Sequence, residues 1–414
     1  MFTSRGIHRG AWRGLLVGLA VLACGIALLC WLLGGQVGDD SGVYRAGALA
    51  LTHGDPLYGT LRFLPHGSID LPFTYPPVAA VLFLPLAVLP PQLVWGVFAV
   101  LTVLGLVLVL RASTTVPIPG WLVAALGLGV YAFEPVWRGL GLGQINVVLM
   151  VLVVLDVLVL PRGRYGGVLV GLAAAIKLTP LIFVLHLLVT GRRADAARAL
   201  GTFAGLNALC LAVMPHNTLT YWRTQLLGGD NATGASYGRN QSLNGLFQRF
   251  LGHSGPAFPL AVLAGLLCLA VALPMARRLY QRGEQLGALL VSAFCGLLAS
   301  PISWTHHWVW LVPLAGLLVS RAVRNPRLGT ILPVAGLAAL GTGIVTMEPV
   351  GNDAEQHWNL AQLVAGNGYV FGTLAVGAVL AVRMFITGRP STPDERQSTE
   401  GLNPASGTPA ANHG

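Results

Sequence analysis

Long apolar runs separated by short polar segments dominate the chain. Ten of them are candidates for membrane-spanning helices, each of which needs roughly 20 mostly apolar residues. They lie at about 15–33, 93–110, 120–133, 145–160, 199–215, 258–275, 285–299, 308–320, 328–347 and 367–382. The first run has no small-residue cleavage pattern and more apolar chain follows it, so we interpret it as a signal anchor. The pattern predicts an all-α polytopic membrane protein.

Two further apolar stretches are irregular. The run 166–189 is interrupted by Lys177 and Pro180, and the run 78–90 lies between two Pro-Pro pairs and is too short to span alone. Because arginines flank both ends of 166–189, we expect both ends on one side of the membrane, with Lys177 and Pro180 near the tip of a broken hairpin. Such irregular backbone must be buried in protein or line a cavity. Ten spans and two half-spans predict about twelve transmembrane segments.

The arginines indicate how the chain is oriented. Only 10% of the residues are charged and 54% are hydrophobic, which excludes a soluble enzyme and a disordered protein. Of the 24 arginines, 18 flank the apolar runs on one side and six on the other, so the first side is cytoplasmic. The net charge of +10 is therefore an orientation signal, and we expect a lipid bilayer but no nucleic acid as partner.

This orientation divides the chain into three parts. Residues 1–14 form a cytoplasmic N-terminus, 15–389 a membrane domain, and 390–414 a polar cytoplasmic tail that we expect to be disordered. Two long polar stretches, 34–77 and 216–257, fall on the outer side. The shorter loops 134–144, 300–307 and 348–366 join them there. We expect the chemistry on this side. The five cysteines all lie in apolar runs, which is typical of small buried side chains.

The first outer stretch opens with two carboxylates, Asp39 and Asp40. They are either a hydrated acid pair at the membrane surface or the site of a general base. A carboxylate that is partly desolvated beside another acid has a raised pKa and can take a proton from a hydroxyl group. Either aspartate fits this description. Tyr44 follows in the same stretch, and Tyr75 precedes a Pro-Pro pair where the chain re-enters the membrane.

Lys177 is the only lysine in the chain and lies within an apolar run. An ammonium group at membrane depth costs several kcal/mol unless it is paired or hydrated. One interpretation is a structural lysine that extends to the surface or pairs with Asp156, the only acid in a neighbouring span. The other is a cation for a phosphate held near the bilayer, because lysine is a common phosphate ligand.

Amides and a hydrogen-bonding loop add polar groups on the same side. Gln144 and Asn146 begin an apolar run, where they either bind sugar hydroxyls or cap a helix. The loop 236–249 carries Arg239, Asn240 and Gln241 within a dense polar run. We treat its glycosylation-sequon match, and the one at Asn231, as chance.

His306 and His307 stand at the mouth of a later run. A metal site is disfavoured, because neighbouring helical residues point about 100° apart and no further ligand stands at the spacing of a zinc helix. They are structural histidines or hydrogen-bonding and acid–base groups. Trp304 belongs to an aromatic belt or stacks on a sugar. We predict no metal and no cofactor.

These residues follow one another in a recognisable order. It reads Asp40-x-x-Val43-Tyr44, Tyr75-Pro76-Pro77, Gly143-Gln144-x-Asn146, Lys177-x-x-Pro180, Asn240-Gln241-Ser242-Leu243 and Ser300-Pro301-x-Ser303-Trp304-x-His306-His307. The pattern covers about 12–385 and resembles glycosyltransferase family 87, the actinobacterial polyprenol-phosphate-mannose-dependent α-(1→2)-mannosyltransferases of the GT-C superfamily. The doublet Asp39-Asp40 departs from a family motif with one aspartate, and the spacing to Tyr44 favours Asp40.

The resemblance implies a GT-C-type fold with an active site on the periplasmic side of the plasma membrane. It implies an inverting transfer of mannose from polyprenyl-phosphate mannose to a mannosylated lipid, either a phosphatidylinositol mannoside or lipomannan. Asp40 would be the base, with His306 or His307 assisting, and Lys177, then Arg239, would bind the donor phosphate. The expected sugar and acceptor contacts are Asp39, Tyr44, Tyr75, Gln144, Asn146, Asn240, Gln241 and Trp304.

Two alternatives remain open at this point. An arabinofuranosyltransferase that uses decaprenyl-phosphate arabinose would need the same base and the same phosphate ligand. A secondary transporter would also bury a lysine in broken helices, but it should show an internal repeat and a polar site near the midplane. We find no such repeat, and the polar residues cluster on one side.

Overall fold

The computed structural model describes residues 9–33, 37–64, 71–160, 163–226, 234–252 and 255–386. Within these ranges all regular structure is helical, and the only β contact is an isolated bridge between Asn240 and Trp304. The all-α prediction is confirmed for this part of the chain. The predicted tail 390–414, residues 1–8 of the predicted N-terminus and the sequon at Asn231 lie outside the described residues.

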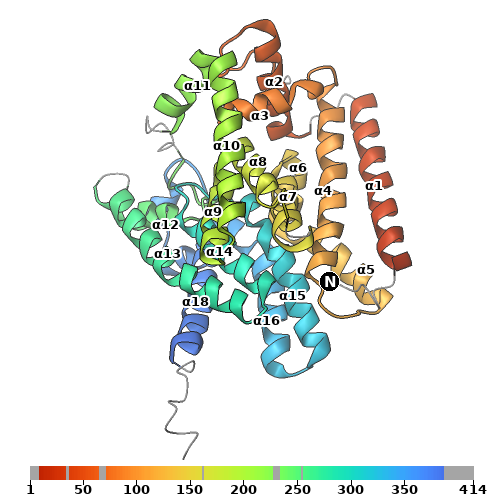
Figure 1. Cartoon of the computed structure of the whole chain (residues 1–414), viewed down its shortest axis with the longest axis vertical. Helices are drawn as coiled ribbons and strands as arrows, with labels where there is room; N and C mark the ends of the chain where they lie inside the picture. Colours follow the sequence, from red (N-terminus) through yellow and green to blue (C-terminus); the bar gives the residue numbers. More distant parts are fainter. Residues whose placement is uncertain are drawn as a thin grey trace, which may run out of the picture. The chain divides into compact units, whose positions relative to one another are not determined.

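Helices form in all ten predicted apolar runs, and further helices form in the polar stretches between them (Figure 1). The α-helices are α1 (Arg9–Leu32), α2 (Asp39–His53), α3 (Pro77–Leu82), α4 (Pro91–Ser113), α5 (Gly120–Gly129), α6 (Glu134–Leu142), α7 (Asn146–Val154), α8 (Val168–Ile176), α9 (Ile182–Val189), α10 (Arg193–Val213), α11 (Pro215–Thr220), α12 (Leu243–Leu251), α13 (Ala257–Gln281), α14 (Gln285–Ala299), α15 (Leu311–Arg324), α16 (Leu328–Gly341), α17 (Leu360–Gly366) and α18 (Gly368–Ile386). Short 3-10 or π segments are η1 (Leu84–Leu86), η2 (Val130–Ala132), η3 (Leu155–Val159), η4 (Thr179–Leu181), η5 (Tyr221–Leu226), η7 (Thr305–Trp310), η8 (Ile344–Thr346) and η9 (Ala354–His357).

Several of these helices can cross a membrane. Four in the described ranges are long and apolar enough to do so alone: α4, α10, α13 and the segment Leu328–Thr346. Two bent pairs, Gly120–Ala132 with Glu134–Leu142 and Leu360–Gly366 with Gly368–Met384, raise the number to six. Other predicted runs form apolar helices that are shorter. The chain is thus a multi-pass membrane protein, and the expected number of about twelve segments stays a prediction.

Close helix contacts hold the first helices together. α1 packs along α4, and α4 packs on α7. A methyl group on Gly96 of α4 would lie 2.5 Å from the Cβ atom of Ala27, and one on Gly105 would lie 2.8 Å from the side chain of Val147. Small residues permit such contacts between membrane helices, where packing replaces the hydrophobic effect as the main attraction.

The interrupted run 166–189 forms a broken hairpin. α8 ends at Lys177, whose backbone is extended, and η4 and α9 lead back from it. The carboxylate of Asp156 accepts hydrogen bonds from the backbone N–H of Gly167, at 2.7 Å, and of Val170, at 3.0 Å. Arg192, just beyond α9, donates to the carbonyl of Val157 at 3.2 Å. The two ends of the hairpin therefore lie together, and Asp156 caps α8 instead of pairing with Lys177.

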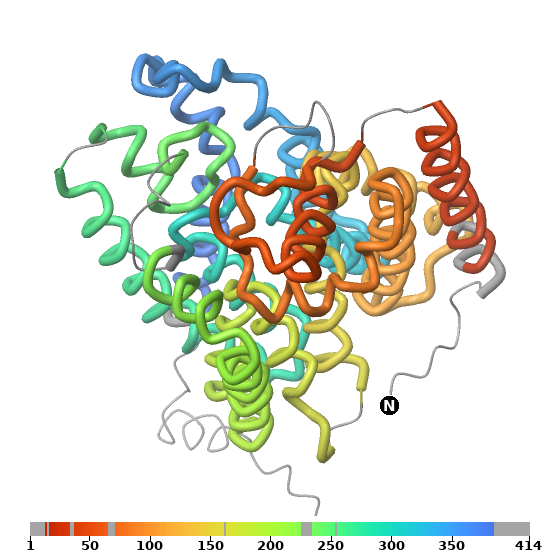
Figure 2. The backbone as a smooth tube through the Cα atoms, turned by 90° about the horizontal axis from the view of Figure 1, so that it is seen from above, coloured from red at the N-terminus to blue at the C-terminus, as the bar shows by residue number. Residues whose placement is uncertain are grey.

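The polar stretch 34–77 contains a packed helix. α2 buries Val43, Tyr44, Ala46 and Ala48 among others, and it packs on α3, η1 and α4. It ends at Gly54, whose φ of 73° favours glycine. Figure 2 looks onto the molecule from the top of Figure 1. The red-orange stretch that holds α2, beside the red α1, lies there in front of the other helices. The placement brings the start of α2 next to α6 and α7.

The described residues from 374 onward belong to a second unit, apart from the rest of the chain. The structure describes this unit only as the continuation of α18 to Ile386. The residues discussed below all precede it.

Candidate active site

Asp40 lies in the first turn of α2 and is partly buried. Its Oδ2 atom accepts a hydrogen bond from Nε2 of Gln144 at 2.7 Å. Burial raises the pKa of Asp40 from its ordinary value of 3.8 to about 6, although the hydrogen bond from Gln144 and the positive charge of Lys177 act in the opposite direction. A carboxylate with this pKa is largely ionised at neutral pH and is basic enough to accept a proton.

Two glycines and a tryptophan bring Asp40 to Gln144. Gly38 precedes α2 and Gly143 ends α6, and both have a positive φ, 77° and 68°. A methyl group on Gly38 would lie 2.7 Å from Trp95, and one on Gly143 would lie 2.6 Å from Oγ of Ser41. Trp95 also donates a hydrogen bond from Nε1 to the carbonyl of Leu140 at 2.8 Å. The two turns can meet only because neither glycine carries a side chain.

A chain of hydrogen bonds extends from Asp40 through Gln144. The hydroxyl of Tyr44 donates to Oε1 of Gln144 at 3.1 Å and lies 3.0 Å from the hydroxyl of Tyr75. The rings of Tyr44 and Tyr75 pack edge to face. Tyr44 is fully buried, so its hydroxyl needs these partners. The network fixes the side chain of Gln144, and Gln144 in turn orients Asp40.

Lys177 joins a second group of polar residues. Its Nζ atom donates to Oδ1 of Asn146 at 3.1 Å and lies 3.1 Å from Nε2 of His307. An ammonium group has no acceptor, so Nε2 of His307 accepts this bond and the proton of a neutral His307 is on Nδ1. Nζ also lies 5.4 Å from the centre of the Tyr75 ring. The ammonium group of Lys177 has three N–H donors, and one of them has no protein acceptor among the described residues.

His306 is buried, and both of its ring nitrogens lack a hydrogen-bond partner in the described part of the chain. Its backbone carbonyl accepts from Nδ2 of Asn146 at 3.1 Å, and its ring meets that of His307 edge to face. Burial, and after it the charge of Lys177, lower the pKa of His306 well below its ordinary value. His306 is therefore a neutral imidazole with two unused polar atoms, which is rare in a buried position unless a ligand or water binds there.

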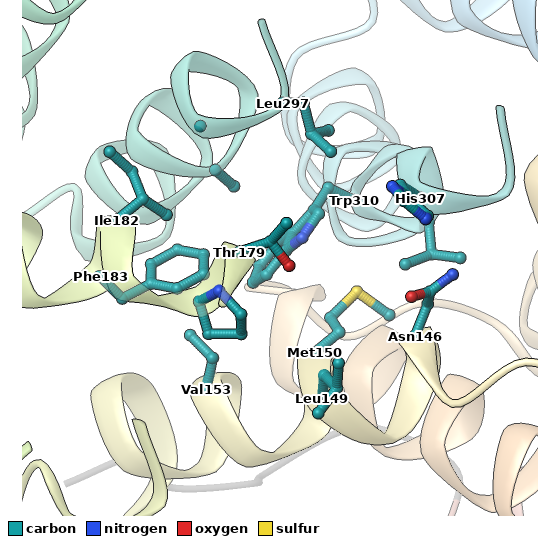
Figure 3. Close-up of a pocket in the computed structure, with 14 residues that line it drawn as sticks. Asn146, Leu149, Met150, Val153, Thr179, Ile182, Phe183, Leu297, His307 and Trp310 are labelled. Atoms are coloured by element: carbon teal, nitrogen blue, oxygen red, sulfur yellow. The ribbon is translucent and has the colours of Figure 1, made fainter. Parts of the chain in front are cut away.

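An apolar pocket begins beside these residues (Figure 3). Asn146 and His307 contribute to its lining, together with Thr179 from the hairpin. The other labelled side chains are apolar: Leu149, Met150, Val153, Ile182, Phe183, Leu297 and Trp310. The pocket therefore combines polar groups that belong to the Lys177 site with a wall that suits a hydrocarbon chain.

Asn240 and Gln241 are fully buried, and their side-chain N–H groups donate to backbone carbonyls. The Nδ2 atom of Asn240 donates to the carbonyl of Ala235 at 2.8 Å, and its Oδ1 atom accepts from the N–H of Ser303 at 2.9 Å. Gln241 donates to the carbonyls of Gly238 and Gly366 at 2.9 Å and 2.5 Å. We expected sugar contacts here, whereas these amides hold the 235–241 loop against the segment before η7.

Three other predicted residues lie on the border of the site. Trp304 is partly exposed, and its ring packs edge to face on Tyr237 with 6.1 Å between the centres. The backbone carbonyl of Arg239 accepts from the N–H of Thr305, which fixes Arg239 beside η7. Asp39 is partly exposed beside Asp40.

A buried acid, Glu134, was not among the predicted site residues. It accepts from Oγ1 of Thr305 at 2.7 Å and from the hydroxyl of Tyr369 at 3.5 Å, and Nε of Arg138 lies 3.8 Å away. Its position before a proline at the start of α6 is an ordinary helix-start signal. The sequence gives no sign of its burial. No group of three or more His, Cys, Asp or Glu that could hold a metal ion occurs in the ranges that the structure describes.

A helical multi-pass membrane protein in which a carboxylate and a lysine lie near an apolar pocket has the groups expected of an integral membrane enzyme. The model of glycosyltransferase family 87 matches residues 73–301. A polyprenol-phosphate-mannose-dependent α-(1-2)-phosphatidylinositol mannoside mannosyltransferase from Mycobacterium tuberculosis is 34% identical over 95% of this chain and 99% of its own length. A protein with the same name from Mycolicibacterium smegmatis is 33% identical over 95% of this chain and 94% of its own length.

Another relative is a polyprenol-phosphate-mannose-dependent α-(1-2)-phosphatidylinositol pentamannoside mannosyltransferase from Mycobacterium tuberculosis. It is 36% identical over 85% of this chain and 83% of its own. No solved structure matches the chain significantly. The chain belongs to glycosyltransferase family 87. The predicted family and the predicted class of enzyme are therefore confirmed, and a secondary transporter is no longer a competing interpretation.

Proposed function

We propose that the protein transfers mannose from polyprenyl-phosphate mannose to a hydroxyl group of a mannosylated lipid and forms an α-(1→2) linkage. The acceptor is a phosphatidylinositol mannoside or lipomannan. The proposal rests on one observation. In a member of this family, a polar site that contains Asp40 and Lys177 lies beside an apolar pocket. The named relatives act on the same donor and acceptor classes.

The donor would use the Lys177 site and the pocket beside it. The free N–H of Lys177 is placed to donate to a phosphate oxygen, and a lysine so close to an apolar wall suits a lipid phosphate better than a soluble one. The polyprenyl chain would lie along Met150, Phe183 and Trp310. Burying that chain supplies binding energy that does not depend on the sugar.

Asp40 would act as the general base. It takes the proton from the acceptor 2-hydroxyl while that oxygen attacks the anomeric carbon of a β-linked mannosyl phosphate. The bond between this carbon and the phosphate oxygen breaks with its electron pair going to polyprenyl phosphate, whose negative charge Lys177 stabilises. Attack from the opposite face inverts the configuration, so a β-linked donor gives an α-linked product. The raised pKa of Asp40 suits this step.

The buried imidazole of His306 would bind a substrate hydroxyl. Its two unpartnered nitrogens offer one donor and one acceptor, and a sugar hydroxyl uses both kinds. His307 would hold Lys177 in position, with Asn146 on its other side. Gln144, Tyr44 and Tyr75 would position Asp40, and the partly exposed Trp304 would face a sugar ring.

We also propose that the site faces the outside of the plasma membrane. The arginine distribution puts the stretches that contain Asp40, His306 and His307 on the side opposite to most arginines. About twelve transmembrane segments, with the hairpin 166–189 inserted from the cytoplasmic side, agree with this orientation.

The test uses membranes from cells that produce the chain, incubated separately with labelled polyprenyl-phosphate mannose and labelled decaprenyl-phosphate arabinose. We expect label from mannose alone in a phosphatidylinositol mannoside, with an α-(1→2) linkage by mannosidase digestion. Membranes with the Asp40→Asn variant are the control. Label from arabinose alone would assign the arabinofuranosyl alternative instead, and label from neither would refute both.

A further inference from the structure

Two arginines outside the Lys177 site lie within electrostatic range of one buried carboxylate, Glu134. Arg138 on α6 has Glu134 as its only hydrogen-bonding or ion-pair partner among the described residues, at 3.8 Å from its Nε atom. Glu134 is fully buried and already accepts hydrogen bonds from Thr305 and Tyr369. The side chain of Arg138 is 27% exposed, so its N–H groups are accessible. A carboxylate with two other donors cannot satisfy a guanidinium that offers five N–H bonds.

Arg239 brings a second guanidinium to the same place. Its backbone is fixed to Thr305, the residue that donates to Glu134. Its Nε atom is buried and has no hydrogen-bond partner in the described ranges. Arg138 and Arg239 influence each other electrostatically, and both also act on Glu134. Two guanidiniums against one buried carboxylate leave a net positive charge and several unused donors.

The helix that carries Arg138 lies close to the reacting groups. α6 packs against η7, and a methyl group on Gly139, next to Arg138, would lie 3.9 Å from the Cβ atoms of both Gln144 and His306. Arg138 is also within electrostatic range of Asp40. Lys177 reaches the site from a different element, the hairpin. Cations thus approach the site from two separate parts of the fold.

We propose that Arg138 and Arg239 form a second anion site, which binds the phosphodiester of one of the two lipid substrates. This inference rests on the proposed function. Planar guanidiniums bind two oxygens of a phosphate at once, whereas the ammonium of Lys177 acts as a point charge. Both substrates of the proposed reaction carry a lipid phosphodiester, and a single lysine serves only one of them. The chemistry recognised is the same for either source.

The experiment measures steady-state mannosyl transfer by the full chain in detergent. The variants are Arg138→Gln, Arg239→Gln and the conservative Arg138→Lys and Arg239→Lys. The control is Arg62→Gln, which removes the same charge from an exposed arginine that pairs with Asp55. Each variant is assayed with a phosphatidylinositol mannoside and with octyl α-mannoside, an acceptor without phosphate. A thermal unfolding curve for each variant shows that it is folded.

If the pair binds the acceptor, the Gln variants raise the KM for the phosphatidylinositol mannoside by about tenfold or more, and octyl α-mannoside shows no change. If it binds the donor, they raise the KM for polyprenyl-phosphate mannose by a similar factor with both acceptors. The Lys variants recover part of the loss in either case. Either result supports an anion site and identifies which of the two lipid substrates it binds.

Folded Gln variants that keep both KM values would overturn the inference, and so would a fall in kcat alone. A Glu134→Gln variant gives an independent measurement, because removing the buried carboxylate leaves the arginines less neutralised. It should lower the same KM that the Gln variants raise, and an unchanged value would count against the site. Absence of mannosyl transfer by the unmodified chain would instead refute the proposed function, so the two failures are distinguishable.

Discussion

At the scale of single residues, the site depends on a few side chains whose partners are distant in the sequence. Asp40 meets Gln144, and Lys177 meets His307 and Asn146. Of the two neighbouring aspartates, Asp40 is the one that accepts a hydrogen bond from Gln144, so the network orients Asp40. We therefore place the proposed catalytic base at Asp40.

Replacing Asp40 by asparagine should remove the base and keep the shape of the side chain. We expect transfer to fall by about 10²- to 10⁴-fold in kcat with a folded protein, which is the usual contribution of general-base catalysis. The measurement is single-turnover transfer from labelled donor. Asp39→Asn is the matched control and should retain most activity. Similar losses in the two variants would contradict the assignment to Asp40.

The pH dependence should report the ionisation of Asp40. Only the carboxylate accepts a proton, and its pKa is raised to about 6, so kcat/KM should be constant above this pH and fall tenfold per unit below it. The hydrogen bond from Gln144 lowers this pKa. A Gln144→Leu variant should therefore move the acidic limb to higher pH. An acidic limb near pH 4 in the unmodified protein would contradict the raised pKa of Asp40.

Replacing Lys177 by alanine should weaken donor binding. The lost charge-assisted hydrogen bond to phosphate predicts a rise of about tenfold or more in the KM for polyprenyl-phosphate mannose. Lys177→Arg keeps the charge and should raise this KM less. The measurement is a donor titration at saturating acceptor. A donor KM that does not change in a folded alanine variant would return Lys177 to a structural role.

At the scale of elements, the hairpin that carries Lys177 is held at its base. Asp156 caps α8, and the backbone of Gly167 packs against Asp195 at the start of α10. The sequence predicted the break at Lys177, because a lysine and a proline interrupt an apolar run. It did not predict the role of Asp156, because capping across two elements depends on how η3 and α8 fold together.

A methyl group at Gly167 should destabilise the protein. Its φ is +92°, and a Cβ atom there would collide with the backbone of Asp195. We expect Gly167→Ala to lower the thermal midpoint in detergent by at least about 2 °C, because the strain costs about 1 kcal/mol or more. Gly205→Ala in α10, where a methyl group meets no atom within 4 Å, is the control and should not lower it. Equal midpoints for the two variants would contradict this packing argument.

At the scale of the whole molecule, the arginine distribution predicts sidedness. In a variant without the five cysteines, a cysteine at Arg62 should react with a membrane-impermeant maleimide in intact cells, whereas one at Arg164 should react only after the membrane is opened. Both arginines are exposed in the fold, so accessibility reports the side of the membrane and not burial. The opposite labelling pattern would invert the proposed topology.

The sequence by itself determined the class of fold, the positions of most helices, the family and the residues Asp40, Gln144, Asn146, Lys177 and His307 as one candidate set. These features are local, since an apolar run or a short motif is visible without its neighbours in space. The tertiary structure alone decided the partners. It directed the side-chain N–H groups of Asn240 and Gln241 to the backbone, and it revealed the buried Glu134 with Arg138 beside it. Hydrogen bonds between residues more than 100 positions apart depend on packing that no local pattern encodes.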